Sequence, residues 1–345
     1  MRGMLLPRLL VVGAIVASFA ACESGGASAP EPTPPPPAGQ TPAPPATGPS
    51  NPSPAPSTPP SGGDTVSENA PPKGGATGGS SSLQNAVETC DLPSNGTGFA
   101  GTQYLSFAGL SYSYELYVAD KYDGHTRFPL VFVFHGDGMS GAEIRSWLSL
   151  EWEAGGNAIF VYPNGPGATW DTSSAVGVNT HVALVDAIVT DMEKRFCVDT
   201  SRIFAWGISR GAFFVNTLGC FRGNIFRGIF ANSGGGPSSP DPRLYGANDY
   251  LECPTAAPAA IVIHGDADQT VGFGAGVESE QHWAMANGCD TTGTPIPVDP
   301  GPCVTYPGCK QPVIWCHLPG YPHKLWEPSE QAAWQLIDST KPKTP

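Results

Sequence analysis

Three side chains that could together carry out nucleophilic catalysis follow one another along the chain in the order serine, aspartate, histidine. Ser209 lies in the run 207–211, GISRG, between an apolar stretch of strand character and an apolar stretch of helical character. This context is typical of a nucleophile elbow, in which a tight turn holds the serine hydroxyl out from a sheet. The five letters alone also fit an ordinary strand-to-helix turn, so the prediction depends on an acid and a histidine.

The acid is assigned to one of two aspartates in the loop after the apolar run 259–263. A neutral serine needs a histidine to accept its proton, and an acid must hold that imidazole in one tautomer. Asp268 lies deeper in this loop and can turn toward a histidine, so we favour it. Asp266 lies nearer the strand end and is expected to bind loop amides.

The base is assigned to His323, which lies among turn-forming residues after the predicted strand 312–318. His317 lies within that strand and is expected to be half-buried. His135 and His264 each precede a glycine at a strand end, and we expect them to brace loops through hydrogen bonds. The remaining histidines are assigned to surface or helical positions: His125, His181 and His282.

Two backbone N–H groups are expected to stabilise an oxyanion beside Ser209. The N–H of Arg210 lies at the start of the following helix and can face that oxyanion. The second donor should come from the loop after strand 128–134, from Asp137 or Gly138, and Asp137 is our candidate. Its carboxylate would repel an oxyanion, so that side chain is expected to point away or to serve the loop.

Alternating strands and helices must position these residues. Strands are predicted from apolar runs at 112–119, 128–134, 158–162, 202–206, 228–231, 259–263 and 312–318, and helices at 178–196, 210–220, 277–287 and 328–337. This alternation indicates an α/β protein with a mostly parallel central sheet and helices on both faces. Sites in such sheets form at the carboxyl ends of the strands, where all three residues lie.

The start of the chain predicts export. Residues 1–21 combine a positive end with an apolar run too short to span a bilayer, which is typical of a signal peptide. Small residues before Cys22 resemble a bacterial lipobox, so Cys22 is expected to carry a lipid anchor; the alternative is plain secretion. Residues 22–87 are a linker rich in Pro, Gly and Ser that cannot bury a core. The catalytic domain is therefore predicted over 88–345.

Charge and cysteine content restrict the partners. The net charge is −13, which argues against nucleic acid, and no apolar run of the domain is long enough for a membrane helix. Besides Cys22, eight cysteines in an exported chain predict up to four disulfides. Cys289 with Cys303 and Cys309 with Cys316 are the expected local pairs. The alternative, a metal site of Cys303, Cys309 and Cys316 near His317, is disfavoured. No metal or cofactor is expected, and the protein is expected to be a monomer.

Six stretches resemble one known family in their order: VFVFHGDG, VYPNG, CVDTSRIFAWGISRG, VIHGDADQTV, HWAMANGC and VIWCHLPGYPH. They are similar to the polyhydroxybutyrate depolymerase/feruloyl esterase family (carbohydrate esterase family 1), over about 90–340. The resemblance implies an α/β-hydrolase fold and a serine carboxylic-ester hydrolase, with Ser209 as nucleophile, Asp268 as acid and His323 as base. Arg210 stands where the family has an asparagine.

Three functions follow as expectations. The first is an exported serine esterase that cleaves feruloyl or acetyl esters on plant polysaccharide through an acyl-enzyme. Trp170, Tyr162 and Trp326 could line its acyl pocket, or they could simply pack in the core. The second is a polyhydroxybutyrate-type polyester depolymerase, and the third a non-catalytic surface binding protein on a hydrolase fold.

Overall fold

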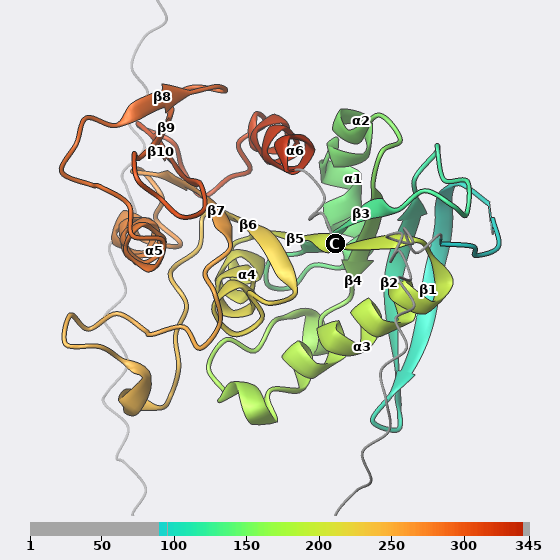
Figure 1. Cartoon of the computed structure of the whole chain (residues 1–345). Helices are drawn as coiled ribbons and strands as arrows, with labels where there is room; N and C mark the ends of the chain where they lie inside the picture. The colour runs from blue at the N-terminus through green and yellow to red at the C-terminus, as the bar shows by residue number, and fades with distance from the viewer. Residues whose placement is uncertain (1–89, 95, 341–345) are drawn as a thin grey trace, which may run out of the picture. The chain divides into compact units, whose positions relative to one another are not determined.

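A single sheet organises the part of the chain that the computed structural model describes, residues 90–94 and 96–340. The predicted signal peptide, Cys22 and the linker to residue 87 lie outside these residues. The sheet has ten strands in the order β1-β2-β4-β3-β5-β6-β7-β10-β9-β8 (Figure 1). The strands are β1 (Gly98–Phe107), β2 (Leu110–Val118), β3 (Phe128–Phe134), β4 (Ile159–Pro163), β5 (Val198–Ile208), β6 (Phe226–Asn232), β7 (Ala259–Gly265), β8 (Ile296–Val298), β9 (Cys303–Thr305) and β10 (Val313–Leu318).

The centre of the sheet is parallel and its margins are antiparallel. Strands β4, β3, β5, β6, β7 and β10 pair in parallel, whereas β1, β2, β8 and β9 join through antiparallel pairs. Every residue of β3, β4 and β7 is buried, which explains why these strands are continuous apolar runs rather than alternating ones. The predicted mostly parallel α/β architecture is confirmed.

Helices cover both faces of this sheet (Figure 1). One core cluster contains residues of α3 and α4 with Trp283 of α5, and the other contains residues of α1, α2 and α6. The helices are α1 (Gly141–Trp147), α2 (Leu150–Ala154), α3 (Thr180–Arg195), α4 (Arg210–Phe221), α5 (Phe273–Ala286) and α6 (Ser329–Ser339), with short 3₁₀ turns η1 (Pro166–Ala168), η2 (Val176–Val178) and η3 (Pro242–Leu244). None of the helices in the described ranges is long and apolar enough to cross a membrane.

Several elements had no counterpart in the sequence analysis. Strand β1 is an edge strand with alternating, partly exposed side chains, so it lacks the apolar run that marks the central strands. Strands β8 and β9 have three residues each, too few to show a period. Helix α1 does carry a signal, because Ser140 and Glu143 form a capping box at its start.

Four disulfides are present in the described residues, and both predicted local pairs are wrong. The bonds join Cys90–Cys197, Cys220–Cys253, Cys289–Cys309 and Cys303–Cys316. Strand register explains the last one, because Cys303 on β9 lies directly opposite Cys316 on β10. Backbone bonds from Asp290 to Pro307 and from Lys310 to Asn287 bring together the segments that carry Cys289 and Cys309.

Removing the disulfide with the longest loop is expected to destabilise the domain measurably. Cys90 and Cys197 are 107 residues apart, and a loop of about 100 residues corresponds to roughly 4.7 kcal/mol of denatured-state entropy. We expect the Cys90→Ser/Cys197→Ser variant to lose about 2–5 kcal/mol of unfolding free energy in urea. Cys289→Ser/Cys309→Ser, which opens a shorter loop, is the comparison. A loss below about 1 kcal/mol for the long loop would contradict the expectation.

Candidate active site

The predicted elbow forms at the end of β5. Ser209 has φ 54° and ψ −121°, a strained conformation for a residue other than glycine that clusters at functional sites. A Cβ on Gly207 would lie 2.3 Å from the carbonyl oxygen of Gly211, and one on Gly211 would lie 2.2 Å from that of Phe134. Both positions therefore require glycine, because the backbones of the neighbouring elements are so close there that no Cβ fits between them.

Asp268 and His323 meet across the ends of β7 and β10. His323 Nδ1 lies 2.7 Å from Asp268 Oδ2, and the Asp268 side chain is 0% exposed. Asp268 Oδ1 also accepts the N–H groups of Thr270 and Val271, at 2.9 and 2.8 Å. Burial raises the pKa of Asp268, but the hydrogen bonds from His323 and these amides outweigh it, so its pKa lies below the usual value. The ionised carboxylate accepts the Nδ1 proton, which leaves the acceptor lone pair of His323 on Nε2.

Asp266 and His317 form a separate pair on the same loops. Asp266 accepts the N–H of Gly320 at 2.6 Å and lies 3.0 Å from His317 Nε2. The Gly320 amide, followed by His317, lowers the pKa of the Asp266 carboxyl. Asp266 therefore fixes the loop after β10, as expected, and Asp268 is the aspartate in contact with His323.

Ser209 and His323 line one cavity of about 820 Å³. Its walls are largely apolar and are built from the loop after β3, the end of α1 and the loop after β10. The other lining residues are Gly136, Asp137, Met139, Trp147, Ile208, Thr270, Lys324, Leu325 and Glu327. Trp147 is 58% exposed and was not predicted, because it is the last residue of a helix that the sequence analysis missed.

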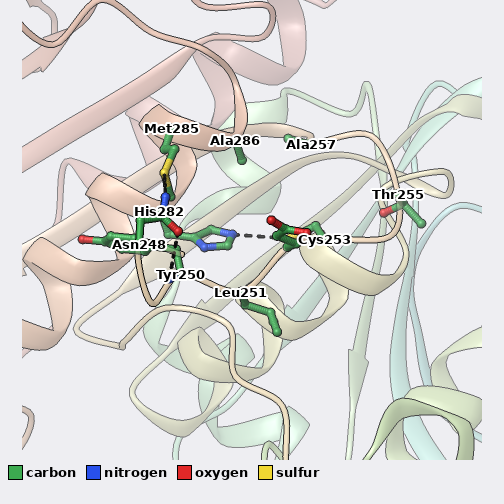
Figure 2. Close-up of a pocket in the computed structure, with 10 residues that line it drawn as sticks. Asn248, Tyr250, Leu251, Cys253, Thr255, Ala257, His282, Met285 and Ala286 are labelled. Atoms are coloured by element: carbon green, nitrogen blue, oxygen red, sulfur yellow. Dashed lines mark hydrogen bonds between the residues drawn. The ribbon is translucent and has the colours of Figure 1, made fainter. Parts of the chain in front are cut away.

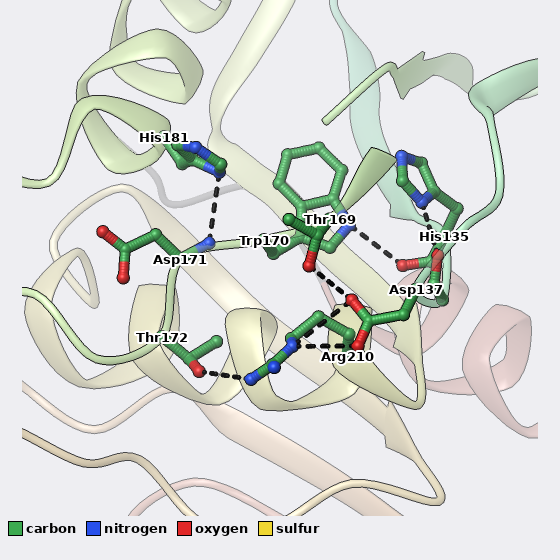
Figure 3. A network of polar contacts seen from close by, with 9 residues as sticks. His135, Asp137, Thr169, Trp170, Asp171, Thr172, His181 and Arg210 are labelled. Atoms are coloured by element: carbon green, nitrogen blue, oxygen red, sulfur yellow. Dashed lines mark hydrogen bonds and ion pairs between the residues drawn. The ribbon is translucent and has the colours of Figure 1, made fainter. Parts of the chain in front are cut away.

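The candidate oxyanion donors lie in the loop after β3 and at the start of α4. The Gly138 N–H donates to the carbonyl of Ala168 at 2.8 Å, which leaves Asp137 as the candidate beside Arg210. The Asp137 carboxylate accepts the Thr169 hydroxyl and lies 3.3 Å from Arg210 Nε (Figure 3). Thr169 in the loop after β4 and Arg210 at the start of α4 thus hold this carboxylate.

His135 and His264 brace loops, as predicted. His135 Nε2 accepts the Gly165 N–H at 3.0 Å, so its proton lies on Nδ1, 2.7 Å from the Gly136 carbonyl. Burial lowers the pKa of His135 and keeps the ring neutral. His264 Nε2 lies 2.9 Å from the Val271 carbonyl, in the same turn that holds Asp268.

Of the two alternatives for Trp170, Tyr162 and Trp326, the structure shows packing in the core and not lining of the cavity. Trp170 is buried and stacks on Phe214. Its indole N–H donates to the His135 carbonyl (Figure 3). Tyr162 is buried with its hydroxyl on Glu151, and Trp326 packs against the core cluster that includes α6. None of the three lines the cavity, because each packs in or against one of the two core clusters.

A second, smaller pocket is lined by two members of a cluster of three potential metal ligands. Figure 2 shows the His282 ring directed at Cys253, with Nε2 and Sγ 3.4 Å apart. Cys220 completes the cluster, but it is joined to Cys253 in a disulfide, so neither sulfur is a thiolate. The alternative metal site of Cys303, Cys309 and Cys316 is likewise not formed, because each of these cysteines is in a disulfide.

Comparison with known proteins identifies the family. No protein-family profile matches the chain. It is 34% identical over 216 residues to feruloyl esterase C of Emericella nidulans, covering 60% of this chain and 74% of that protein. It is 36% identical over 182 residues to probable feruloyl esterase C of Aspergillus niger, covering 51% and 62%. Acetyl xylan esterase from Aspergillus awamori shares the fold, with a TM-score of 0.55, 16% identity and coverage of 69% and 99%. The chain therefore belongs to the feruloyl esterase C family of carboxylic ester hydrolases and has the α/β-hydrolase fold.

Proposed function

We propose that this protein is an exported serine esterase that cleaves feruloyl or acetyl esters on plant polysaccharide through an acyl-enzyme. The observation that carries the proposal is the 2.7 Å contact between His323 Nδ1 and Asp268, beside a cavity that His323 shares with Ser209. The names of the relatives, feruloyl esterase C, support the acyl class.

The proposed mechanism has two half-reactions, and in each of them His323 acts first as base and then as acid. Ser209 Oγ attacks the ester carbonyl while His323 Nε2 accepts its proton, and Asp268 stabilises the resulting imidazolium. The N–H groups of Arg210 and Asp137 stabilise the oxyanion. His323 then protonates the departing alcohol, which leaves Ser209 acylated. Water attacks the acyl group while His323 again accepts a proton, and His323 then returns that proton to Ser209 Oγ as the bond to the acyl group breaks and the carboxylic acid leaves.

The cavity supports an aromatic acyl group. Met139, Trp147 and Leu325 supply apolar walls beside Ser209, and an aromatic ring packs favourably against a tryptophan. Lys324 and Glu327 lie on the same lining and offer polar contacts. We therefore place the feruloyl ring against Trp147.

The localisation is also part of the proposal. Four disulfides in the described residues are typical of an exported protein. We propose that the signal peptide 1–21 directs export, that Cys22 carries a lipid anchor, and that 22–87 links it to a monomeric catalytic domain, 88–345. Metabolic labelling with a palmitate analogue, lost in Cys22→Ala, tests the anchor.

A panel of esters tests the activity. The mature chain, without 1–21, is incubated with methyl ferulate, p-nitrophenyl acetate and polyhydroxybutyrate, and acid release is measured. We expect turnover of methyl ferulate. Turnover of polyhydroxybutyrate without methyl ferulate would instead indicate a polyester depolymerase. No turnover of any substrate would contradict an esterase and favour a binding protein.

Trp147→Ala is expected to raise KM for methyl ferulate about tenfold, because loss of one aromatic contact costs roughly 1.4 kcal/mol. KM for p-nitrophenyl acetate, whose acetyl group has no ring, should change less than about twofold. The matched control is Trp152→Ala, since Trp152 is 82% exposed and does not line the cavity. Equal changes of KM for both esters would place the ring elsewhere.

A further inference from the structure

We infer that the side chains of Arg210 and Asp137 form a clamp in which the Arg210 guanidinium neutralises the Asp137 carboxylate beside the two oxyanion donors. The inference rests on the function proposed above. It assigns to these side chains an electrostatic role, distinct from the hydrogen bonds that their backbone N–H groups make. The clamp consists of Arg210 and Asp137 with the two hydroxyls that hold them, Thr169 and Thr172.

The clamp joins the two segments that supply the donors. Arg210 is the first residue of α4, and Asp137 lies in the loop after β3. Their side chains meet with Arg210 Nε 3.3 Å from Asp137 Oδ2 (Figure 3). The two residues that carry the candidate N–H groups are therefore also joined to each other, through their side chains, although they lie on separate elements.

Both partners are held from a third segment, the loop after β4. Thr169 donates its hydroxyl to Asp137 Oδ1, and Arg210 Nη1 donates to Thr172 Oγ1 at 3.0 Å (Figure 3). Each charged side chain thus has a neutral partner besides the opposite charge. These contacts fix the direction of both side chains, which an exposed ion pair alone would not do.

Charge gives the clamp its functional consequence. Asp137 lines the cavity beside Ser209, and its side chain is 55% exposed. A carboxylate there opposes the negative charge that develops on the substrate oxygen during attack. The Arg210 guanidinium, always charged, offsets that repulsion. Without Arg210, the uncompensated carboxylate would raise the barrier for each tetrahedral step, while the neutral ester would still bind.

The clamp is not needed to hold the fold. An ion pair whose members are 40% and 55% exposed contributes little to stability. The loop after β3 is independently fixed by the Gly138 N–H on Ala168 and by the His135 ring, which lies between Gly136 and Gly165. Removing the side-chain pair should therefore change the rate of catalysis rather than the folded structure.

Kinetics of four variants test the clamp: Arg210→Gln, Asp137→Asn, the double variant, and Arg243→Gln as control. Arg243 pairs with Asp241 at 2.7 Å outside the cavity. We expect Arg210→Gln to lower kcat for methyl ferulate about 30-fold, with KM within about twofold. The double variant should recover kcat to within about fivefold of wild type, because the repelling carboxylate is gone. Arg243→Gln should remain within about twofold.

Two results would overturn the clamp: Arg210→Gln with the wild-type kcat, or a double variant as slow as Arg210→Gln. A purely structural role predicts the second result, since losing both partners would then be no better than losing one. Sodium chloride provides a further readout, because screening should raise kcat of Arg210→Gln and leave wild type unchanged. If Arg210→Gln does not fold, Arg210→Lys replaces it. Lysine keeps the positive charge but not the planar, two-pronged guanidinium, so kcat of that variant should fall less than tenfold.

Failure of the clamp and failure of the proposed function are distinguishable. If the function is wrong, wild-type protein does not turn over esters. If only the clamp is wrong, wild-type protein is active and Ser209→Ala is not, yet Arg210→Gln behaves as wild type.

Discussion

Ser209→Ala is expected to lower kcat for methyl ferulate by at least about 10⁴-fold. Alanine has no hydroxyl to attack the ester, so only binding and the oxyanion donors remain. Because the cavity keeps its other walls, KM should change little. Steady-state hydrolysis, measured against wild type prepared in parallel, checks the result.

The matched control for this serine is Ser146→Ala. Ser146 is exposed on α1 and its hydroxyl contacts only the Glu143 carbonyl among the hydrogen bonds of the described residues. Its activity should stay within about twofold of wild type. Retention of more than a few per cent of the activity by Ser209→Ala would show that another group is the nucleophile.

Asp268→Asn is expected to lower kcat about 10⁴-fold. The carboxylate now accepts the Nδ1 proton of His323, whereas an asparagine amide can donate to Nδ1 and favour the wrong tautomer. Nε2 would then carry the proton and could not accept one from Ser209. Hydrolysis of p-nitrophenyl acetate across pH measures the loss.

Asp266→Asn provides the control within the same loop. Asp266 also contacts a histidine, His317, but neither of them lines the cavity. Its replacement should cost less than about tenfold in kcat, through a looser turn at Gly320. If the two asparagine variants lost equal activity, the assignment of the acid to Asp268 would be wrong.

The central strands of the sheet were predictable because they are apolar along their whole length. Strands buried on both faces must be apolar throughout, so the predicted strand 128–134 coincides with β3. The margins were not predictable in this way, since β1 is half-exposed and its pattern is interrupted by glycines. Disulfide pairing also escaped prediction, because the register of β9 on β10 places Cys303 opposite Cys316, and spacing does not reveal register.

The pairing of Asp268 with His323 was predictable from the order serine, aspartate, histidine and from the strand ends. Parallel strands bring their carboxyl ends to one edge, and in the structure β7 and β10 are neighbours at that edge. The residues of the cavity wall were harder to predict from the sequence, because the direction of an aromatic ring depends on how its neighbours pack. Trp170 turns onto Phe214 and leaves the rim, whereas Trp147 reaches it from a helix that went unrecognised.

The link between Arg210 and Asp137 shows the same limit. The sequence indicated that both backbone N–H groups face the oxyanion, and it identified the problem of a carboxylate beside that charge. It did not indicate that Arg210 supplies the compensating charge, because the two residues are 73 positions apart and meet only once α4 packs beside the loop after β3.

Mapping the site of a fluorophosphonate adduct tests the central claim most directly. The mature protein is treated until hydrolysis of methyl ferulate stops, digested with trypsin and analysed by mass spectrometry. We expect one adduct per chain, on Ser209 in the peptide 203–210, and none in Ser209→Ala. Complete inhibition with the adduct on another residue, or active protein that never acquires one, would contradict it.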